Sequence, residues 1–196
     1  MDSPPSRKEI THDRIVATAA RAIRRGGFQG VGVADIMKEA GLTHGGFYAH
    51  FSSRNALLAE ALERAGRDSA ARVSQHTAAR QVRGASALRA MVEGYLSDRH
   101  LGKIDSGCPL AALASEMPRQ SPEVREVSAQ RVRGLVAAVQ RALPKDARAD
   151  SGPAIASQMV GALQLARALG DNAEGRALLK ASRQALLAQY DRQPSV

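Results

Sequence analysis

The feature that most limits how this chain can fold is a pair of short helical patterns that meet at one glycine. Apolar side chains recur at helical spacing over residues 33–40, and Gly41 follows them as a residue at which the chain can turn sharply. Thr43, two residues later, is a favourable N-cap for a second helix over residues 43–51. The sequence therefore predicts a helix, a tight turn and a second helix in direct succession.

The second of these helices contains two adjacent glycines, Gly45 and Gly46. A glycine inside a helix costs about 1 kcal/mol relative to alanine, so helix stability does not explain the pair. At the angular spacing of an α-helix, Phe47 and Phe51 define the core side, and both glycines then lie opposite, together with Ala49. The predicted outward face is therefore small, and another molecule can approach its backbone closely.

An outward face of this kind is typical of a helix that lies in the major groove of DNA, and helix-turn-helix is the matching motif. Small residues let the backbone approach base edges, and the helix N-terminus offers N–H donors to phosphate. The candidate DNA contacts are Thr43 and His44 at base edges, Gly45 and Gly46 at the groove floor, Tyr48 and His50 on phosphates, and Lys38 and Arg54 as backbone anchors. The same geometry also occurs in structural helical hairpins, where a glycine pair marks a helix–helix contact.

The rest of the sequence is also helical in pattern, with no alternating strand pattern and no hairpin turn. Thr11 is the expected N-cap of the first helix, which Gly26 and Gly27 end. Ser53 is the expected N-cap of a long helix that runs to about His76. Further helices are expected over residues 85–100, 109–117, 122–143, 152–169 and 173–190.

Charge and composition narrow the class of protein. The net charge of +9 suggests an anionic partner, most commonly nucleic acid, but residues 1–65 carry only +2 and residues 66–196 carry +7, so charge alone does not locate the site. No apolar run approaches the 18 residues of a membrane span, and the N-terminus lacks the apolar core of a secretory signal. The single cysteine, Cys108, excludes an intramolecular disulfide and fits a reducing cytoplasm.

The block VADIMKEAGLTHGGFYAHFSSRNALLAEAL, residues 33–62, resembles the N-terminal DNA-binding domain of the TetR family of transcriptional repressors. The residues that carry the resemblance are the Asp-Ile pair before the turn and Gly41, Leu42, Thr43, Gly45, Tyr48, His50, Phe51, Ser53, Arg54 and Leu57. It implies an all-α fold of about nine helices. A three-helix DNA-binding domain is expected at residues 9–69, with its helix-turn-helix motif at about 32–51, and a ligand-binding and dimerisation domain at 70–196.

The resemblance also implies a homodimer that binds a palindromic operator and is released by a small ligand. Neither a cofactor nor a metal is expected. The last two long helices are expected to form the dimer interface through Ile155, Met159, Leu163, Leu178 and Leu186. In such proteins the residues that match Thr43, Tyr48 and His50 contact DNA, and the residue that matches Arg54 often contacts phosphate. The chain departs from the family at Val31 and Gly32, where a hydroxyl side chain is usual, so these two residues are not expected to contact DNA. At His44 the family more commonly has Lys or Arg, so the base preference of other members does not apply to this chain.

The segment GCPLAALASEM, residues 107–117, is similar to one found in a subgroup of these repressors named for multidrug-efflux and flavonoid-responsive regulation. The ligand pocket is expected near it, among the helices of the second half, and its candidate lining residues are Met91, Tyr95, Met117 and Gln164. Each of these is otherwise a core residue. With so few aromatic residues, the lining argues against a pocket that stacks on flat cations.

Cys108 precedes Pro109, a favourable first residue of a helix, so the thiol is expected at a helix N-terminus. The helix dipole there lowers the pKa of a thiol, and Cys108 is therefore a candidate sensor of electrophiles or oxidants. The alternative is a small buried apolar residue at a helix start.

Two other functions are open to a helical chain of this kind. An enzyme would need Cys108 paired with His100 or His76, because no metal-spaced cluster and no glycine-rich phosphate loop is present. A purely structural helical dimer would bind no DNA. The sequence favours a ligand-responsive transcriptional regulator, expected to act as a repressor, over both.

Overall fold

The computed structural model describes residues 4–191, and within this range the chain forms nine α-helices and two short 3₁₀-helices without any strand. The order is α1 (Arg7–Gly26), α2 (Val33–Glu39), η1 (His44–Ala49), α3 (Arg54–Gln81), α4 (Ala87–Tyr95), α5 (Asp98–Gly102), α6 (Pro109–Leu113), η2 (Met117–Arg119), α7 (Pro122–Ala142), α8 (Ser151–Leu169) and α9 (Ala173–Tyr190). The predicted all-α fold is confirmed. No helix among the described residues is long and apolar enough to cross a membrane.

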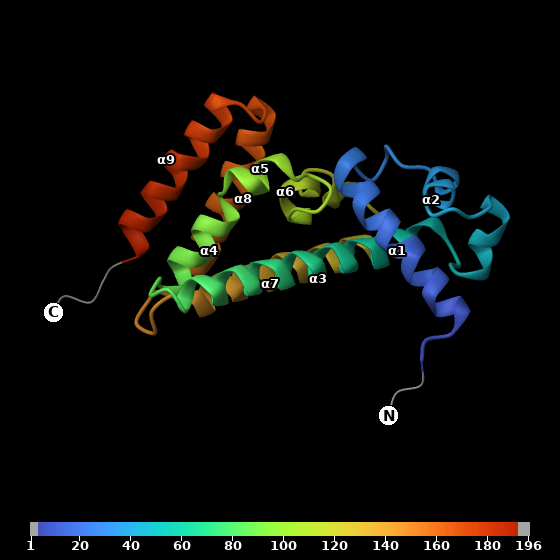
Figure 1. Cartoon of the computed structure of the whole chain (residues 1–196), viewed down its shortest axis with the longest axis horizontal. Helices are drawn as coiled ribbons and strands as arrows, with labels where there is room; N and C mark the ends of the chain where they lie inside the picture. The colour runs from blue at the N-terminus through green and yellow to red at the C-terminus, as the bar shows by residue number, and fades with distance from the viewer. Residues whose placement is uncertain (1–3, 192–196) are drawn as a thin grey trace.

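The longest helix, α3, connects the two ends of the molecule (Figure 1). Its first half packs against α1, and its second half runs beside α7 and meets α4. All of its buried residues lie between Leu57 and Ala65, whereas residues 66–81 are mainly small or polar. Because α3 continues without a break past residue 69, one rigid element joins the N-terminal helices to the C-terminal ones.

The first helix begins earlier than its expected N-cap, Thr11. Ser6 is the N-cap, and its Oγ accepts a hydrogen bond from the Glu9 backbone N–H at 3.3 Å while the Glu9 carboxylate accepts from the Ser6 N–H at 2.6 Å. This reciprocal capping box satisfies the backbone N–H groups of Ser6 and Glu9, and it stabilises a helix start ahead of Thr11. Thr11 instead lies within α1, where its hydroxyl donates to the Arg7 carbonyl at 2.8 Å.

Two expected helices are shorter than their sequence pattern suggested. The pattern at 85–100 divides into α4 and α5, because Ser97 caps a new helix by accepting a hydrogen bond from the His100 N–H at 3.2 Å. The pattern at 109–117 divides into α6 and the single turn η2. The long helix begins after Ser53 as predicted but extends beyond His76 to Gln81.

The residues expected at the dimer interface are placed elsewhere by the structure. Ile155, Met159, Leu163 and Leu186 are buried inside the single chain, and Leu178 is half-buried against the same core. Ile155, Met159, Leu163 and Leu186 therefore belong to the core that α8 and α9 form with the helices beneath them, so the prediction is wrong for these four, whereas Leu178 keeps part of its surface exposed and stays a prediction.

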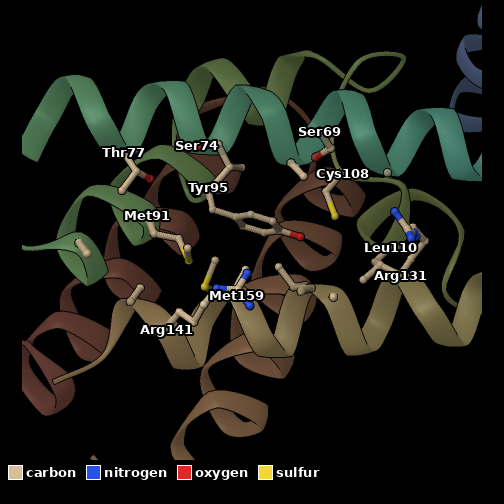
Figure 2. Close-up of a pocket in the computed structure, with 18 of the residues that line it drawn as sticks. Ser69, Ser74, Thr77, Met91, Tyr95, Cys108, Leu110, Arg131, Arg141 and Met159 are labelled. Atoms are coloured by element: carbon tan, nitrogen blue, oxygen red, sulfur yellow. The ribbon is translucent and has the colours of Figure 1, made fainter. Parts of the chain in front are cut away.

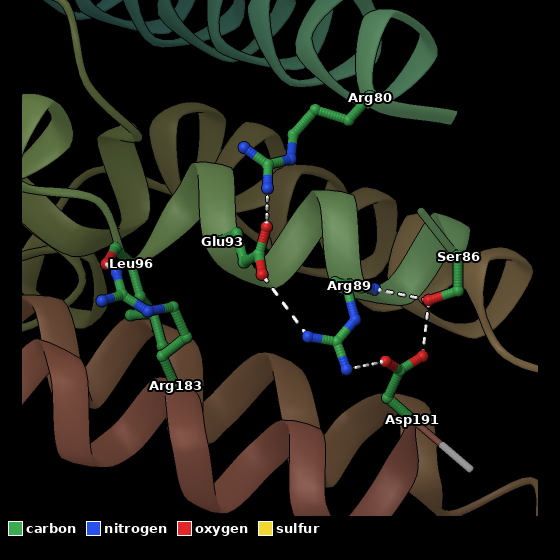
Figure 3. Close-up of polar contacts among 7 residues, drawn as sticks. All are labelled: Arg80, Ser86, Arg89, Glu93, Leu96, Arg183 and Asp191. Atoms are coloured by element: carbon green, nitrogen blue, oxygen red, sulfur yellow. Dashed lines mark hydrogen bonds and ion pairs between the residues drawn. The ribbon is translucent and has the colours of Figure 1, made fainter. Parts of the chain in front are cut away.

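Polar contacts attach the end of α9 to α4 (Figure 3). Asp191 accepts a hydrogen bond from Ser86 Oγ at 2.5 Å and pairs with the Arg89 guanidinium at 2.6 Å. Arg183 donates to the Leu96 carbonyl at 2.8 Å, at the C-terminal end of α4. Glu93 joins this group to α3 through Arg80. The C-terminal helices are thus held to the body of the chain by charge as well as by apolar packing.

Candidate functional site

The turn between α2 and η1 has the geometry that its sequence predicts. Gly41 has a φ of 72°, the left-handed region that favours glycine, and its N–H donates to the Lys38 carbonyl at 3.0 Å. The Leu42 N–H then donates to the Met37 carbonyl at 2.9 Å. Phe47 of η1 is buried in the same core as Met37. The turn and this anchor fix the orientation of η1 against α2.

The segment predicted as an α-helix over residues 43–51 is a 3₁₀-helix, His44–Ala49. Thr43 is its N-cap by backbone position, but the Thr43 hydroxyl makes no capping hydrogen bond. Short length and two successive glycines both disfavour a regular α-helix, and 3₁₀ geometry is common in pieces of this size. The Thr43 side chain is exposed and keeps its hydroxyl for an external partner.

The outer surface of η1 is open, as the glycine pair predicted, but the two glycines differ. A Cβ added to Gly45 would meet no atom within 4 Å. A Cβ added to Gly46 would lie 3.7 Å from Met37 Cε, so Gly46 faces partly toward α2. Tyr48 projects outward and is 73% exposed, and His44 is exposed as well. Gly45, His44 and Tyr48 therefore form the centre of the accessible surface.

His50 lies at the edge of this surface and is only half-buried, yet its Nδ1 is buried without a hydrogen-bond partner. Loss of solvent, with smaller contributions from His12 and Lys8, lowers the pKa of His50. The His12 ring lies 6.0 Å away, stacks on Phe51 at 4.6 Å and bonds to Glu60 at 2.7 Å. His50 is thus favoured in its neutral form, which can donate a hydrogen bond to phosphate without carrying charge.

Arg54 and Lys38, the two expected backbone anchors, are placed differently. Lys38 is exposed on α2. The Arg54 guanidinium is half-buried and donates to the carbonyls of Phe28 and Val31, the latter at 3.3 Å. It therefore holds the loop between α1 and α2 in place, a role that sequence reasoning missed because nothing near Arg54 in the chain indicates these partners.

A cavity of about 610 Å³ lies between α3, α4 and α7 in the second half of the chain (Figure 2). A second hollow, of about 670 Å³, adjoins it on the side of α5 and shares Ser69, Val73, Thr77, Met91 and Tyr95 with it. Met91 and Tyr95, two of the four expected pocket residues, line both spaces. Met117 is buried in η2 and Gln164 is half-buried in α8, and neither borders these spaces.

Tyr95 and Cys108 bring polar atoms to the wall of the cavity. The Tyr95 hydroxyl is buried and has no hydrogen-bond partner, and Figure 2 shows it directed toward the Cys108 side. Burial, reinforced by the Cys108 thiol, raises the pKa of Tyr95 well above its ordinary value, so the hydroxyl keeps its proton. Cys108 is the N-cap of α6, as predicted, and is buried.

His100 supports the backbone at Cys108. Its Nε2 accepts a hydrogen bond from the Cys108 N–H at 2.9 Å, so the ring proton is on Nδ1, which donates to the Tyr95 carbonyl at 2.7 Å. Burial, together with Arg167 and Arg72, lowers the pKa of His100 to about 4. His100 is therefore neutral and fully used in structural contacts, which leaves it unsuited to act as a base for the Cys108 thiol.

The segment from Ser106 to Glu116 joins the cavity to α1 and to the loop between α1 and α2. On the N-terminal side, Arg24 of α1 is buried and donates to the Gly107 carbonyl at 3.2 Å. The Glu116 carboxylate accepts a hydrogen bond from the Phe28 N–H at 2.9 Å. Cys108 lines the cavity between these two contacts. Two hydrogen bonds thus connect the cavity wall to α1 and to the loop that follows it.

Comparison with known proteins agrees with this arrangement. A family model described as bacterial regulatory proteins of the tetR family matches residues 15–61, and one described as a tetracyclin repressor-like C-terminal domain matches residues 84–182. An uncharacterized HTH-type transcriptional regulator of Mycobacterium tuberculosis is 27% identical over 170 residues, which cover 81% of this chain and 85% of that protein. The Bacillus subtilis HTH-type regulator YerO is 39% identical over 51 residues, which cover 26% of this chain and 18% of that protein.

Two solved structures share the fold. The reduced form of Escherichia coli NemR aligns with a TM-score of 0.76 at 21% identity, covering 95% of this chain and 100% of that one. A TetR transcriptional regulator from Chloroflexus aurantiacus aligns with a TM-score of 0.73 at 21% identity, covering 95% and 96%. Because one family model matches the helix-turn-helix segment and the other matches half of the chain, this protein belongs to the TetR family of DNA-binding transcriptional regulators.

Proposed function

We propose that this protein is a repressor that binds a palindromic operator as a homodimer and is released when a small molecule enters the cavity between α3, α4 and α7. The observation that carries the proposal is the open surface of η1 at one end of a chain whose other end holds that cavity. The Ser106–Glu116 segment borders the cavity and contacts α1 and the loop after α1, which belong to the N-terminal helices.

The DNA contacts follow from which side chains of η1 are accessible. Thr43 and His44 reach base edges at the entrance of the groove, and Gly45 lets the backbone approach the groove floor. Tyr48 donates a hydrogen bond to phosphate from its hydroxyl, and His50 donates one from its ring N–H at the other edge. Lys38 supplies a charge to the backbone beside the turn. Gly46 serves the packing on α2 more than the contact with DNA.

The homodimer forms through the faces of α8 and α9 that the single chain leaves exposed. On α8 these include Leu165, which is 61% exposed, and Leu169, which is 37% exposed. On α9 the exposed positions include several alanines, among them Ala177, Ala181 and Ala188. A two-fold axis through these faces buries apolar surface on both copies and gives two η1 segments for the two halves of a palindrome.

Release follows from the contacts of the Ser106–Glu116 segment. A ligand that displaces the cavity wall at Cys108 changes the position of Gly107 and Glu116, and through them that of Arg24 and Phe28. Since α1 packs along α3, a shift of α1 changes the spacing of the two η1 segments in a dimer. Such a shift lowers operator affinity without unfolding either domain.

Electrophile sensing by Cys108 is a second candidate form of release, favoured by the place of this thiol in the cavity wall. An electrophile in the cavity would form a covalent bond to Sγ, with the thiol proton transferred to the adduct. The test compares operator release by an electrophile in the wild type and in Cys108→Ser. Equal release by both proteins would exclude this form and leave reversible ligand binding.

Gel shifts on the DNA beside the protein's own gene test the main proposal. We expect a specific complex with two chains per operator and an affinity that falls steeply as salt rises, because phosphate contacts release counterions. Tyr48→Phe removes one exposed hydroxyl and should weaken the complex, whereas Tyr190→Phe, at the end of α9, should not. Absence of any specific complex, or affinity that does not respond to salt, would contradict the proposal.

A further inference from the structure

The walls of the cavity between α3, α4 and α7 carry positive charge without any negative charge. Two arginines of α7, Arg131 and Arg141, line it, and no aspartate or glutamate does. The adjoining hollow likewise has no acidic residue in its lining and includes Arg72, Arg99 and Lys103. A cation entering this space would find no counterion, whereas an anion would.

Neither α7 arginine has an acidic partner within the part of the chain that the structure describes. Other arginines nearby in the sequence do have one: Arg133, on the same helix, pairs with Glu126 at 3.5 Å, and Arg148 pairs with Asp150 at 2.7 Å. Arg131 is half-buried, and its Nε is enclosed without a hydrogen-bond partner. A partly buried guanidinium without a partner is costly, and a bound carboxylate removes that cost.

Gly66 in the middle of α3 makes room for the Arg131 side chain. A Cβ at Gly66 would lie 2.3 Å from Arg131 Cδ and 3.1 Å from Nη1, so an alanine there would push Arg131 aside. A glycine inside a long helix is otherwise unfavourable. The close approach of Arg131 to Gly66 indicates that Arg131 is held over the α3 wall of the cavity and is not a freely extended surface side chain.

Other walls of the cavity supply an apolar surface and unused hydrogen-bonding groups. Met91, Leu110 and Met159 give an adaptable apolar lining. The Tyr95 hydroxyl and Thr77 Oγ1 are buried without partners, as is Arg131 Nε. Three unsatisfied polar groups around one cavity are what a missing ligand would leave behind, because buried polar groups in proteins are normally paired.

From this arrangement we propose that the cavity binds an amphipathic organic acid, whose apolar body lies on the methionines and whose carboxylate is held by Arg131. Arg141 is ten residues further along α7, a rise of about 15 Å along the helix axis, and it is the more exposed of the two arginines. Arg131 is the anchor because a charge pair is stronger where solvent is excluded. The inference rests on the proposed function only in identifying this ligand with the effector.

Matched ligands test the proposal by calorimetry on the full chain. Decanoate and 2-naphthoate are each compared with the neutral primary amide of the same skeleton, and decanoate also with decylamine. We expect both acids to bind roughly tenfold or more tightly than their amides, and decylamine not to bind, because hydrogen bonds to charged groups are the stronger ones. If neither acid binds better than its amide, the proposal is overturned.

Variants of α7 assign the anchor. Arg131→Met should remove the preference for acids, whereas Arg125→Met, an exposed arginine of α7 outside the cavity, should preserve it. Gly66→Ala, which leaves the charge but displaces it, should reduce the preference. Arg131→Met should also melt at or above the wild-type temperature without ligand, since it removes an unpaired charge. A loss of preference in Arg125→Met, or its survival in Arg131→Met, would contradict the assignment.

Gel shifts with the same ligands separate this inference from the proposed function. Acids that bind in calorimetry but leave the operator complex intact would support the anion site and overturn its role as the effector site. Release of the operator by the amides alone would support ligand control and overturn the preference for acids. Release by the acids, lost in Arg131→Met, would support both.

Discussion

At Gly45 the stability of the helix and the approach to DNA favour different residues. The Cα of Gly45 faces open space, so a larger side chain fits without displacing any neighbour. We expect Gly45→Leu to keep or raise the free energy of unfolding, by up to about 1 kcal/mol, because leucine is the better helix former. The same side chain would occupy the groove floor and weaken operator binding roughly tenfold or more.

Fluorescence anisotropy with operator DNA at one salt concentration measures this effect, and urea denaturation measures stability. Ala137→Leu, on the exposed side of α7, is the matched control, because it adds the same side chain far from η1. If Gly45→Leu binds DNA as the wild type does, this face of η1 does not lie against the groove.

His100 makes the stability of the protein depend on pH. Its pKa is lowered to about 4 in the folded chain, mainly by burial, whereas an unfolded histidine has a pKa of about 6.5. Below pH 6.5 His100 therefore binds a proton in the unfolded state, whereas in the folded state it stays neutral down to about pH 4. We expect the free energy of unfolding to fall by about 1.5 kcal/mol between pH 6.5 and pH 5 from this residue.

Urea denaturation at several pH values measures this loss. In His100→Gln the decline over that range should be smaller by about the same amount, whatever the absolute stability of the variant. His44→Gln, which removes an exposed histidine of η1, should leave the decline unchanged. An equal decline in His100→Gln and the wild type would show that another group controls it.

Single residues were predictable where their role is local. The turn at Gly41, the N-cap at Ser53 and the outward position of Gly45 depend on a few neighbouring residues, and all three are as expected. The capping box of Ser6 and Glu9 is also visible in the sequence as Ser-x-x-Glu, but Thr11 is an equally favourable cap residue, and the sequence alone did not separate the two. The partners of Arg54 lie 23 and 26 positions away, and no local pattern could indicate them.

At the scale of elements, the contact between Glu116 and the loop after α1 is the link that can be broken most cleanly. Glu116→Ala leaves the Phe28 N–H without its acceptor, so we expect the free energy of unfolding to fall by about 2 kcal/mol. Glu116→Gln keeps a carbonyl oxygen at the same place and should recover most of that loss. Hydrogen exchange at the Phe28 amide should be faster in Glu116→Ala than in Glu116→Gln. Equal exchange in both would mean that the hydrogen bond does not protect this loop.

Element boundaries followed the sequence only where a cap and an apolar stripe agree. The apolar stripe across residues 85–100 continues through Leu96, so periodicity alone predicts one helix. The structure has two, because Ser97 is the N-cap of α5 and α4 ends before it. In α3 the stripe fades after Ala65, yet the helix persists to Gln81 because α4 and α7 pack beside it. The cavity occupies the region where that stripe is missing, which explains why only Met91 and Tyr95 were foreseen in its lining.

At the scale of the whole molecule, α8 shows why periodicity cannot identify an interface. One face of this helix carries Ile155, Met159 and Leu163, which the chain buries in its own core. Another carries Leu165 and Leu169, which remain exposed. A sequence with apolar residues on two faces does not say which one meets a partner, and the more regular stripe is the one a single chain requires for folding.

The exposed face of α8 gives the test of assembly. Leu165→Glu should leave the folded monomer intact, because the side chain is already 61% exposed. In a dimer through α8 and α9 it would bury a carboxylate without a partner, which we expect to raise the dimer dissociation constant about 100-fold or more. Sedimentation velocity over a concentration series measures this constant.

Operator affinity should fall together with dimerisation in Leu165→Glu, because one η1 segment reads only half of a palindrome. Val82→Glu is the control: Val82 is 88% exposed just past the end of α3 and is not part of the exposed faces of α8 and α9, so its change should affect neither measurement. If Leu165→Glu remains a dimer with full affinity, the two copies meet through another surface. If it becomes a monomer that still binds the operator with wild-type affinity, assembly through α8 is real but DNA recognition does not require it.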